Sequence, residues 1–206
     1  MPTRPPQLDP VFVLLFGKQP PRRLDRRRFP RLKKALKKLG LMTEQISEVL
    51  GVSAETFSVE LCEGNNACVS REGEISVGIE LLEEHQRDDE LLVAILSHEM
   101  GHQPWTWPQG SVGKLTRKQR NALLREEEAK ADRFAGKALA DLGLAPDAIC
   151  KFLIALEKFE THPPADYYPA PVRAQMIREA FRRRRRTLKD AARFNPAAAL
   201  RERELR

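Results

Sequence analysis

Apolar residues recur at helical spacing over two short stretches near the start of the chain. Over residues 32–39 they stand three and four positions apart, with lysines between them. Gly40 is typical of a helix end, so we expect this helix to stop there. Thr43 suits an N-cap, and the second stretch predicts a helix that runs from there to Gly51. The pattern therefore predicts two consecutive short helices.

Beyond Gly51 the hydrophobic period changes from helical spacing to alternation. Short alternating stretches predict three strands, at residues 56–61, 67–70 and 75–78. Gly73 lies in a polar turn between the last two, so we expect a small antiparallel sheet. The remainder predicts helices only, over residues 89–103, 117–142, 146–159 and 171–194. The predicted class is α+β, mostly helical with a small antiparallel sheet.

Length and composition favour one domain with extensions, or at most two small domains, and no membrane-spanning helix. The 206 residues are 41% hydrophobic, which is enough for a core. No apolar run approaches the roughly 18 residues of a membrane-spanning helix, and the apolar stretch 11–16 is too short for a signal peptide. Three cysteines, Cys62, Cys68 and Cys150, do not suit a disulfide framework. We therefore expect a cytoplasmic protein with free thiols.

The net charge of +7 hides a strong division along the chain. Residues 1–40 carry 12 basic and 2 acidic side chains, and residues 173–206 carry 12 and 4. Residues 41–172 carry 12 basic and 23 acidic side chains, so basic ends flank an acidic middle. We divide the chain into an N-terminal arm with one helix (1–40), a central domain (41–180) and a basic tail (181–206).

The segment His98-Glu99-Met100-Gly101-His102 carries the clearest chemical signal in the chain. It matches the pattern H-E-x-x-H and follows an apolar stretch that predicts a helix. Two histidines four residues apart lie one turn apart on the same face, so both imidazoles can reach one metal ion. Glu99 projects beside them, where its carboxylate can accept a proton from a metal-bound water. The competing interpretation is a pair of surface histidines on an ordinary amphipathic helix.

A third ligand decides the kind of zinc site. The pattern His-x-x-Gly-x-x-His does not follow, which disfavours a metzincin. A later predicted helix carries Glu128 and Asp132 four residues apart on one face. Glu128 can supply the third ligand, and Asp132 can accept a hydrogen bond from the distal nitrogen of a zinc-bound histidine. Two histidines, one carboxylate and one open position are typical of a catalytic zinc ion, one per chain.

At these residues the chain resembles the HtpX-like and CAAX-prenyl-protease-type zinc peptidases, which are gluzincins. The resemblance covers about residues 59–177 and includes Asn66-Ala67, Gly78, Leu81-Leu82, Asp89-Glu90-Leu91, Ser97 to His102, Glu128 to Asp132 and Thr161-His162-Pro163-Pro164. It implies a zincin-type domain with His98, His102 and Glu128 as zinc ligands, Glu99 as general base and Asp132 as hydrogen-bond partner of a ligand. It also implies that an edge strand, here Ile75–Gly78, holds the substrate backbone.

The chain departs from this family's pattern in two respects. Many members carry transmembrane helices, and none is predicted here. The family places an arginine six residues after the histidine, but Tyr168 stands there, and Arg173 follows eleven residues after His162. An insertion at residues 166–170 would give Arg173 the family role. His162 can donate to a developing oxyanion, block the open zinc position or serve structure, and Tyr167 and Tyr168 are rival oxyanion donors.

Arg182–Arg186 form an unbroken basic run inside the last predicted helix. Five successive side chains point to all sides of a helix, so they cannot all face a core. A solvated face is one interpretation. The others are contact with nucleic acid, with an anionic membrane surface or with the acidic middle of the same chain.

We expect the central domain to be a zinc-dependent endopeptidase that acts on an extended polypeptide, with Glu99 as general base. Two alternatives stay open. One is a latent or regulatory zinc protein whose site is blocked by His162 or a basic arm. The other is a basic nucleic-acid-binding protein with a structural zinc site. The intact general base favours the peptidase, because a structural site does not need one. Neither the cleavage preference nor the oligomeric state follows from the sequence.

Overall fold

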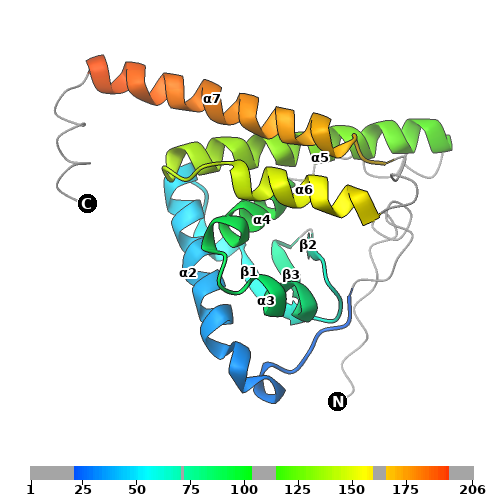
Figure 1. Ribbon diagram of the computed structural model, residues 1–206. Coiled ribbons are helices and arrows are strands. Elements are labelled where there is room, and N and C mark those ends of the chain that lie inside the picture. The colour runs from blue at the N-terminus through cyan, green and yellow to red at the C-terminus, as the bar shows by residue number, and fades with distance from the viewer. Residues whose placement is uncertain (1–20, 71, 104–114, 160–165, 195–206) are drawn as a thin grey trace.

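Helices make up most of the described part of this computed structural model, which comprises residues 21–70, 72–103, 115–159 and 166–194. Besides short 3-10 helices, they are α2 (Lys33–Leu50), α3 (Ile79–His85), α4 (Asp89–Gly101), α5 (Arg117–Asp141), α6 (Asp147–Phe159) and α7 (Ala170–Phe194), shown in Figure 1. The strands are β1 (Ser58–Cys62), β2 (Ala67–Val69) and β3 (Glu74–Gly78). The mostly helical α+β class is confirmed, and α3 is a helix that the sequence pattern did not predict.

Helix α2 crosses the position at which the sequence predicted a break. Gly40 lies in its interior, and the helix ends at Gly51, which adopts the left-handed conformation with φ 66°. A glycine inside a helix costs about 1 kcal/mol relative to alanine, whereas each buried leucine contributes about 1.5–3 kcal/mol. Leu39 and Ile46 are buried on either side of Gly40, so their packing outweighs it. The prediction of two helices is wrong, and a boundary at residue 40 divides α2.

The sheet is mixed rather than antiparallel, and its strand order is β1-β3-β2. β2 and β3 pair antiparallel across a tight turn, but β1 pairs parallel with the other side of β3. The chain passes from β1 to β2 across the end of β3 at Gly78, where a Cβ atom would lie 2.2 Å from the carbonyl oxygen of Gly64. Only glycine fits at residue 78, because a side chain there would meet the crossing chain. As a result of the crossing, β1 pairs with β3 in the parallel direction and not in the antiparallel direction that we predicted.

Strand β3 is therefore the central strand, which corrects the expectation that Ile75–Gly78 is an edge available to a substrate. The outer edge of β1 carries a further short stretch of chain. Leu24 donates its backbone N–H to Leu61 at 2.8 Å, and Glu63 donates to Arg22 at 2.9 Å. This stretch covers the β1 side of the sheet, while β2 forms the edge on the other side.

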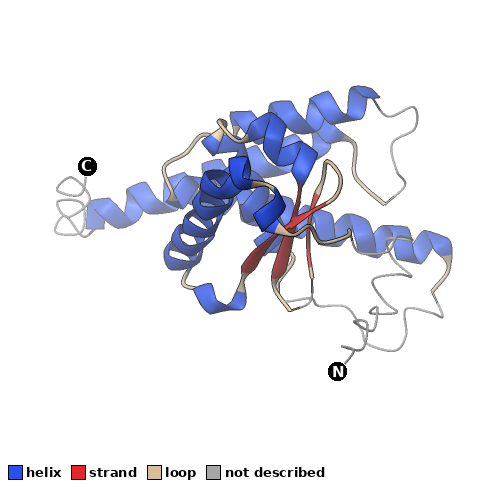
Figure 2. Cartoon of the chain, turned by 90° about the horizontal axis from the view of Figure 1, so that it is seen from below, coloured by secondary structure: helices blue, strands red, loops and turns tan. Residues whose placement is uncertain are grey.

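Helix α4 is the centre of the domain and contacts α2, α5, α6 and β2. Its residues 91–97 are all buried, as expected for a helix that is apolar on every side. Figure 2 shows the three strands as a small sheet lying among the helices. α5 and α7 run side by side in the same direction, because Asp132 contacts Arg173 and Asp141 contacts Arg184. Among the described helices, none combines the length and apolar character needed to cross a bilayer.

Candidate metal centre

The last turn of α4 places both motif histidines at the same end of the helix. Asp88 caps the other end, where its side chain accepts a hydrogen bond from the backbone N–H of Leu91 at 3.0 Å. His102 is the C-cap residue, and the rings of His98 and His102 lie 5.0 Å apart between centroids. His102 is 6% exposed. The two imidazoles are thus held in the interior, on the side of α4 that faces α5.

Helix α5 brings the predicted carboxylates to the same place. Thr116 and Gln119 form a capping box that fixes the start of the helix. At Gly101 the two helices approach so closely that a Cβ atom would lie 2.9 Å from Cα of Ala131. This contact sets Glu128 and Asp132, both buried, against the end of α4. Glu128 and Asp132, which lie on one face of α5, therefore both contact His98.

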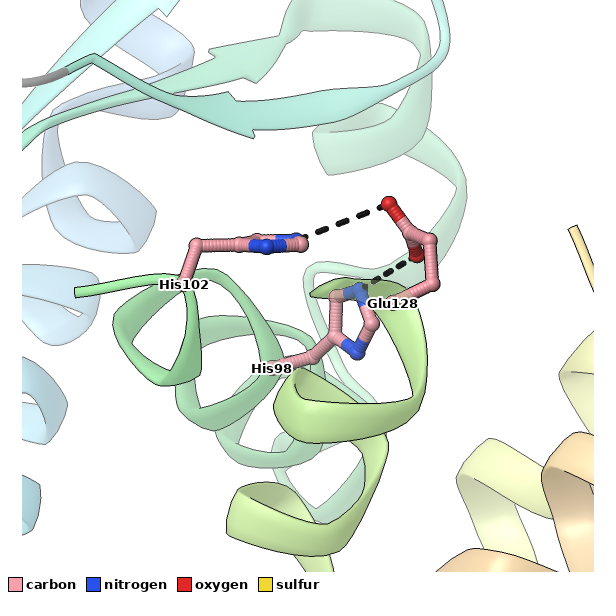
Figure 3. Close-up of side chains that lie close together, drawn as sticks. All are labelled: His98, His102 and Glu128. Atoms are coloured by element: carbon pink, nitrogen blue, oxygen red, sulfur yellow. Dashed lines mark ion pairs between the residues drawn. The ribbon is translucent and has the colours of Figure 1, made fainter. Parts of the chain in front are cut away.

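Three side chains converge on one point between the two helices, as Figure 3 shows. Nε2 of His98 lies 3.2 Å from Oε2 of Glu128, and Nε2 of His102 lies 3.7 Å from Oε1 of the same carboxylate. One nitrogen or oxygen from each of the three residues can be chosen so that all lie within 4.8 Å of one another. The predicted set of ligand atoms is brought together.

The spacing of these atoms fits a zinc ion. Bonds of roughly 2.0–2.1 Å at tetrahedral angles place neighbouring ligand atoms about 3.3 Å apart. The observed separations of 3.2 and 3.7 Å lie on either side of that value. Two imidazoles and a carboxylate are also a donor set that zinc accepts in catalytic sites. His98, His102 and Glu128 therefore offer donor atoms of a suitable kind that lie within 4.8 Å of one another.

Asp132 fixes the orientation of His98 from the other side of the ring. Its Oδ1 lies 3.1 Å from Nδ1 of His98, which leaves Nε2 directed toward Glu128. Arg173 donates to the same carboxylate through Nε at 2.8 Å and Nη2 at 3.0 Å, and Nη2 is also 3.2 Å from Glu128. Arg173, which the sequence connected to the site only through the family resemblance, thus contacts two carboxylates of α5.

The surroundings of the two histidines shift their pKa values in opposite directions. Burial alone would lower the pKa of His98, but hydrogen bonds to Asp132 and Glu128 raise it to about 10. Burial lowers the pKa of His102 to about 4. Burial opposes ionisation of Glu128 and Asp132, yet the hydrogen bonds to His98 bring both of their pKa values below the ordinary range. Asp132 and Glu128 stabilise the protonated form of His98. A metal ion bound at Nε2 of His98 would replace the proton on that nitrogen, so metal binding would release a proton.

Glu99 is buried beside the histidines, on the helix that contacts β2. Burial raises the pKa of its carboxyl to about 7, and the charge of His98, with a smaller influence from the backbone of Val69, acts against that rise. Cys68, the neighbouring residue of β2, is close enough for the charge of Glu99 to raise the pKa of its thiol. The sequence did not predict that Glu99 lies near β2, because no local pattern indicates which distant strand a side chain faces.

The two tyrosines that were rival oxyanion donors lie in different surroundings. Tyr168 donates its hydroxyl hydrogen to Glu126 at 2.7 Å on the surface. Tyr167 has its ring 5.2 Å from the guanidinium carbon of Arg173, and the charge of Glu128 is the largest influence that raises its pKa. Tyr167 is therefore the tyrosine at the candidate site. His162 lies outside the described residues.

Comparison of the sequence with family models and with curated proteins, and of the structure with solved structures, finds no match. The assignment of the site thus depends on the chemistry and geometry of this chain.

Proposed function

We propose that this chain is a zinc-dependent endopeptidase of the gluzincin type. The observation that carries the proposal is the convergence of His98, His102 and Glu128 within 4.8 Å, with a buried Glu99 next to them. Within the described part of the chain the group offers three donors, and a three-donor zinc site with an open position is typical of catalysis. A structural site would not need a buried carboxylate at Glu99.

Each residue of the site has a distinct task in this proposal. His98, His102 and Glu128 would hold the metal, which would supply a Lewis acid able to polarise a peptide carbonyl and to lower the pKa of water. Glu99 accepts a proton from the attacking water and later delivers it to the leaving amine. In this proposal Tyr167, whose ring lies 5.2 Å from the guanidinium carbon of Arg173, donates a hydrogen bond to the oxyanion.

The substrate in this proposal is an extended stretch of polypeptide. β2 is the outer strand on the side of the sheet that lies against α4 and near Glu99, whose charge acts on Cys68 of β2. An extended peptide can add to an edge strand through main-chain hydrogen bonds, whatever its sequence. We therefore assign substrate alignment to Ala67–Val69 and not to the central strand β3.

The decisive experiment compares zinc content and peptide hydrolysis in the wild type, Glu99→Gln and Glu90→Gln. Glu90 is an exposed residue of the same helix and serves as the matched control. We expect about one zinc per chain in all three proteins. Casein hydrolysis should fall by about a hundredfold or more in Glu99→Gln alone, since general acid–base catalysis contributes about 10²–10⁴.

Two results would contradict the proposal. One is hydrolysis by Glu99→Gln at the wild-type rate. The other is a full zinc complement in the double variant His98→Ala/His102→Ala, provided that its circular dichroism spectrum matches that of the wild type.

A further inference from the structure

The C-terminal half of α7 presents a row of cations along one side. Arg182, Arg186, Lys189 and Arg193 follow one another at intervals of four, three and four residues, so they share one face of the helix. All four side chains are exposed, as are Arg183 and Arg185 on the two flanks. We call these six residues the basic face. From Arg182 to Arg193, a span of 12 residues, it extends about 16 Å along the helix axis.

Packing against α5 fixes the direction in which the basic face points. Ile177 is fully buried, and its carbonyl oxygen lies so close to Gly136 that a Cβ atom there would be 2.3 Å away. About two turns further on, Arg184 donates to Asp141, the last residue of α5, at 2.7 Å. Figure 1 shows α7 continuing beyond that end of α5. The side of α7 opposite these contacts, which is the basic face, is therefore held toward solvent.

The charges of the basic face are largely uncompensated. Residues 182–194 contain seven basic side chains and one acidic side chain, so the net charge is +6. Arg193 lies 3.9 Å from Asp190. Within the part of the chain that the structure describes, the other five members make no ion pair or hydrogen bond through their side chains. Such a concentration of guanidinium groups requires an anionic partner or solvent, and it opposes self-association.

We propose that the basic face of α7 binds the phosphate backbone of nucleic acid. Guanidinium groups match phosphate oxygens through paired N–H donors, and five of the six members are arginine. A straight row of cations fits a polymer that repeats its negative charges along a line. Cations on both flanks allow the exposed end of the helix to face phosphates on the two sides of a groove, since a major groove admits a helix.

An anionic membrane fits the same surface less well. A helix that lies in a membrane interface inserts a broad apolar side between the headgroups. In α7 the apolar residues Ala174 and Ile177 are fully buried in the domain core, and Phe181 packs against that core. The side that faces outward carries the six cations, and Phe181 beside them is only partly exposed. We therefore take phosphate of nucleic acid, not lipid, as the ligand.

The test measures binding of the full-length protein to a fluorescent 20-base-pair DNA duplex and to single-stranded RNA of equal length between 50 and 300 mM salt. The variant is Arg182→Gln/Arg186→Gln/Lys189→Gln. The matched control, Lys33→Gln/Lys34→Gln/Lys37→Gln, removes the same charge from exposed positions of α2. The logarithm of the affinity falls linearly with the logarithm of the salt concentration, and each phosphate contact adds about 0.7–0.9 to the steepness of that line. The variant, which lacks three cations, should therefore show a slope that is less steep by about 2–3. Its affinity at 100 mM salt should fall by about tenfold or more, and the control should stay close to the wild type.

Three results would overturn this proposal. They are equal weakening by both triple variants, binding to phosphatidylserine vesicles without binding to either polynucleotide, and no binding to any of the three. Wild-type binding should survive Glu99→Gln and removal of zinc by a chelator. Failure of the peptidase proposal and failure of this one are therefore distinguishable.

Discussion

Among single residues, Asp132 has the largest part in fixing the candidate metal site. Its carboxylate accepts hydrogen bonds from Nδ1 of His98 and from two nitrogens of Arg173, and its side chain is 1% exposed. A carboxylate in this position sets the ring orientation of a ligand and raises its basicity. The contacts of Asp132 with His98 and Arg173 also link α7 to α4 through α5, so the candidate metal site is supported by residues outside the proposed ligand set.

Replacing Asp132 by asparagine should weaken zinc binding without removing a ligand. We expect a 10–100-fold loss of zinc affinity, the range usual for a hydrogen-bond partner of a ligating histidine. Competition with a chromophoric chelator measures it. Asp190→Asn, at an exposed position of α7, is the control and should bind zinc like the wild type. Equal affinities in the wild type and Asp132→Asn would show that Asp132 does not orient His98.

The thiol of Cys68 should be unreactive in the native protein. Burial, together with the charge of Glu99, raises its pKa to about 12. Since the thiolate is the reactive form, alkylation at pH 8 should be about a thousandfold slower than for a free thiol of ordinary pKa. Iodoacetamide labelling followed by peptide mass spectrometry reports the rate at this residue, and labelling in urea gives the unfolded reference. Labelling of native Cys68 at the reference rate would contradict the prediction.

Between elements, the approach of α4 to α5 at Gly101 controls where the ligands meet. A Cβ atom at this position would lie 2.8 Å from Cβ of Phe134 and 2.9 Å from Cα of Ala131. Backbone atoms cannot rotate away as the end of a long side chain can. Any side chain at residue 101 therefore separates the helix that carries the histidines from the helix that carries Glu128.

Gly101→Ala should accordingly lower stability by about 1–3 kcal/mol, the usual cost of forcing extra volume into a packed core. Urea unfolding gives the free energy, and the zinc affinity of the variant should fall with it. Gly40→Ala is the control, because a Cβ atom there meets nothing within 4 Å. That substitution, inside a helix, should raise stability by about 0.5–1 kcal/mol. A Gly101→Ala protein as stable as the wild type would show that the interface can relax.

The elements that the sequence predicted well are those whose signal is local. The buried run 91–97 and the H-E-x-x-H pair lie within one helix, and Glu128 and Asp132 lie within another. The errors are at positions where distant packing overrides a local preference. Gly40 favours a helix end, but the core keeps α2 continuous. The pairing of β1 depends on the crossing at Gly78, and no alternation pattern reports it.

For the whole molecule, a metal ion at this site would join two parts of the chain that are far apart in sequence. His102 and Glu128 are separated by residues 103–127, and the ion would cross-link α4 to α5. Because the unfolded chain lacks this arrangement, the free energy of binding adds to the free energy of folding. Zinc should therefore stabilise the entire domain and not only the site.

Removal of zinc by a chelator should lower the melting temperature by about 5–10 °C. This follows from about 2.7 kcal/mol at a zinc concentration of 100 times Kd and about 2–4 °C per kcal/mol for a domain of this size. Differential scanning calorimetry measures the shift. Glu99→Gln should show the same shift, and His98→Ala should show almost none. Identical melting with and without the chelator in the wild type would contradict zinc binding to the folded state.

The short stretch of chain along the outer edge of β1 has a practical consequence for truncated forms of this protein. Starting the polypeptide at residue 21 retains the bonds that join Arg22 and Leu24 to that strand. Starting it at residue 41 removes them together with Leu32, Leu36 and Leu39, which are buried. The shortened chain would present bare strand backbone and an unfilled core, two features that promote intermolecular β-pairing and precipitation. Its loss of activity would then reflect aggregation rather than the removal of a regulatory arm.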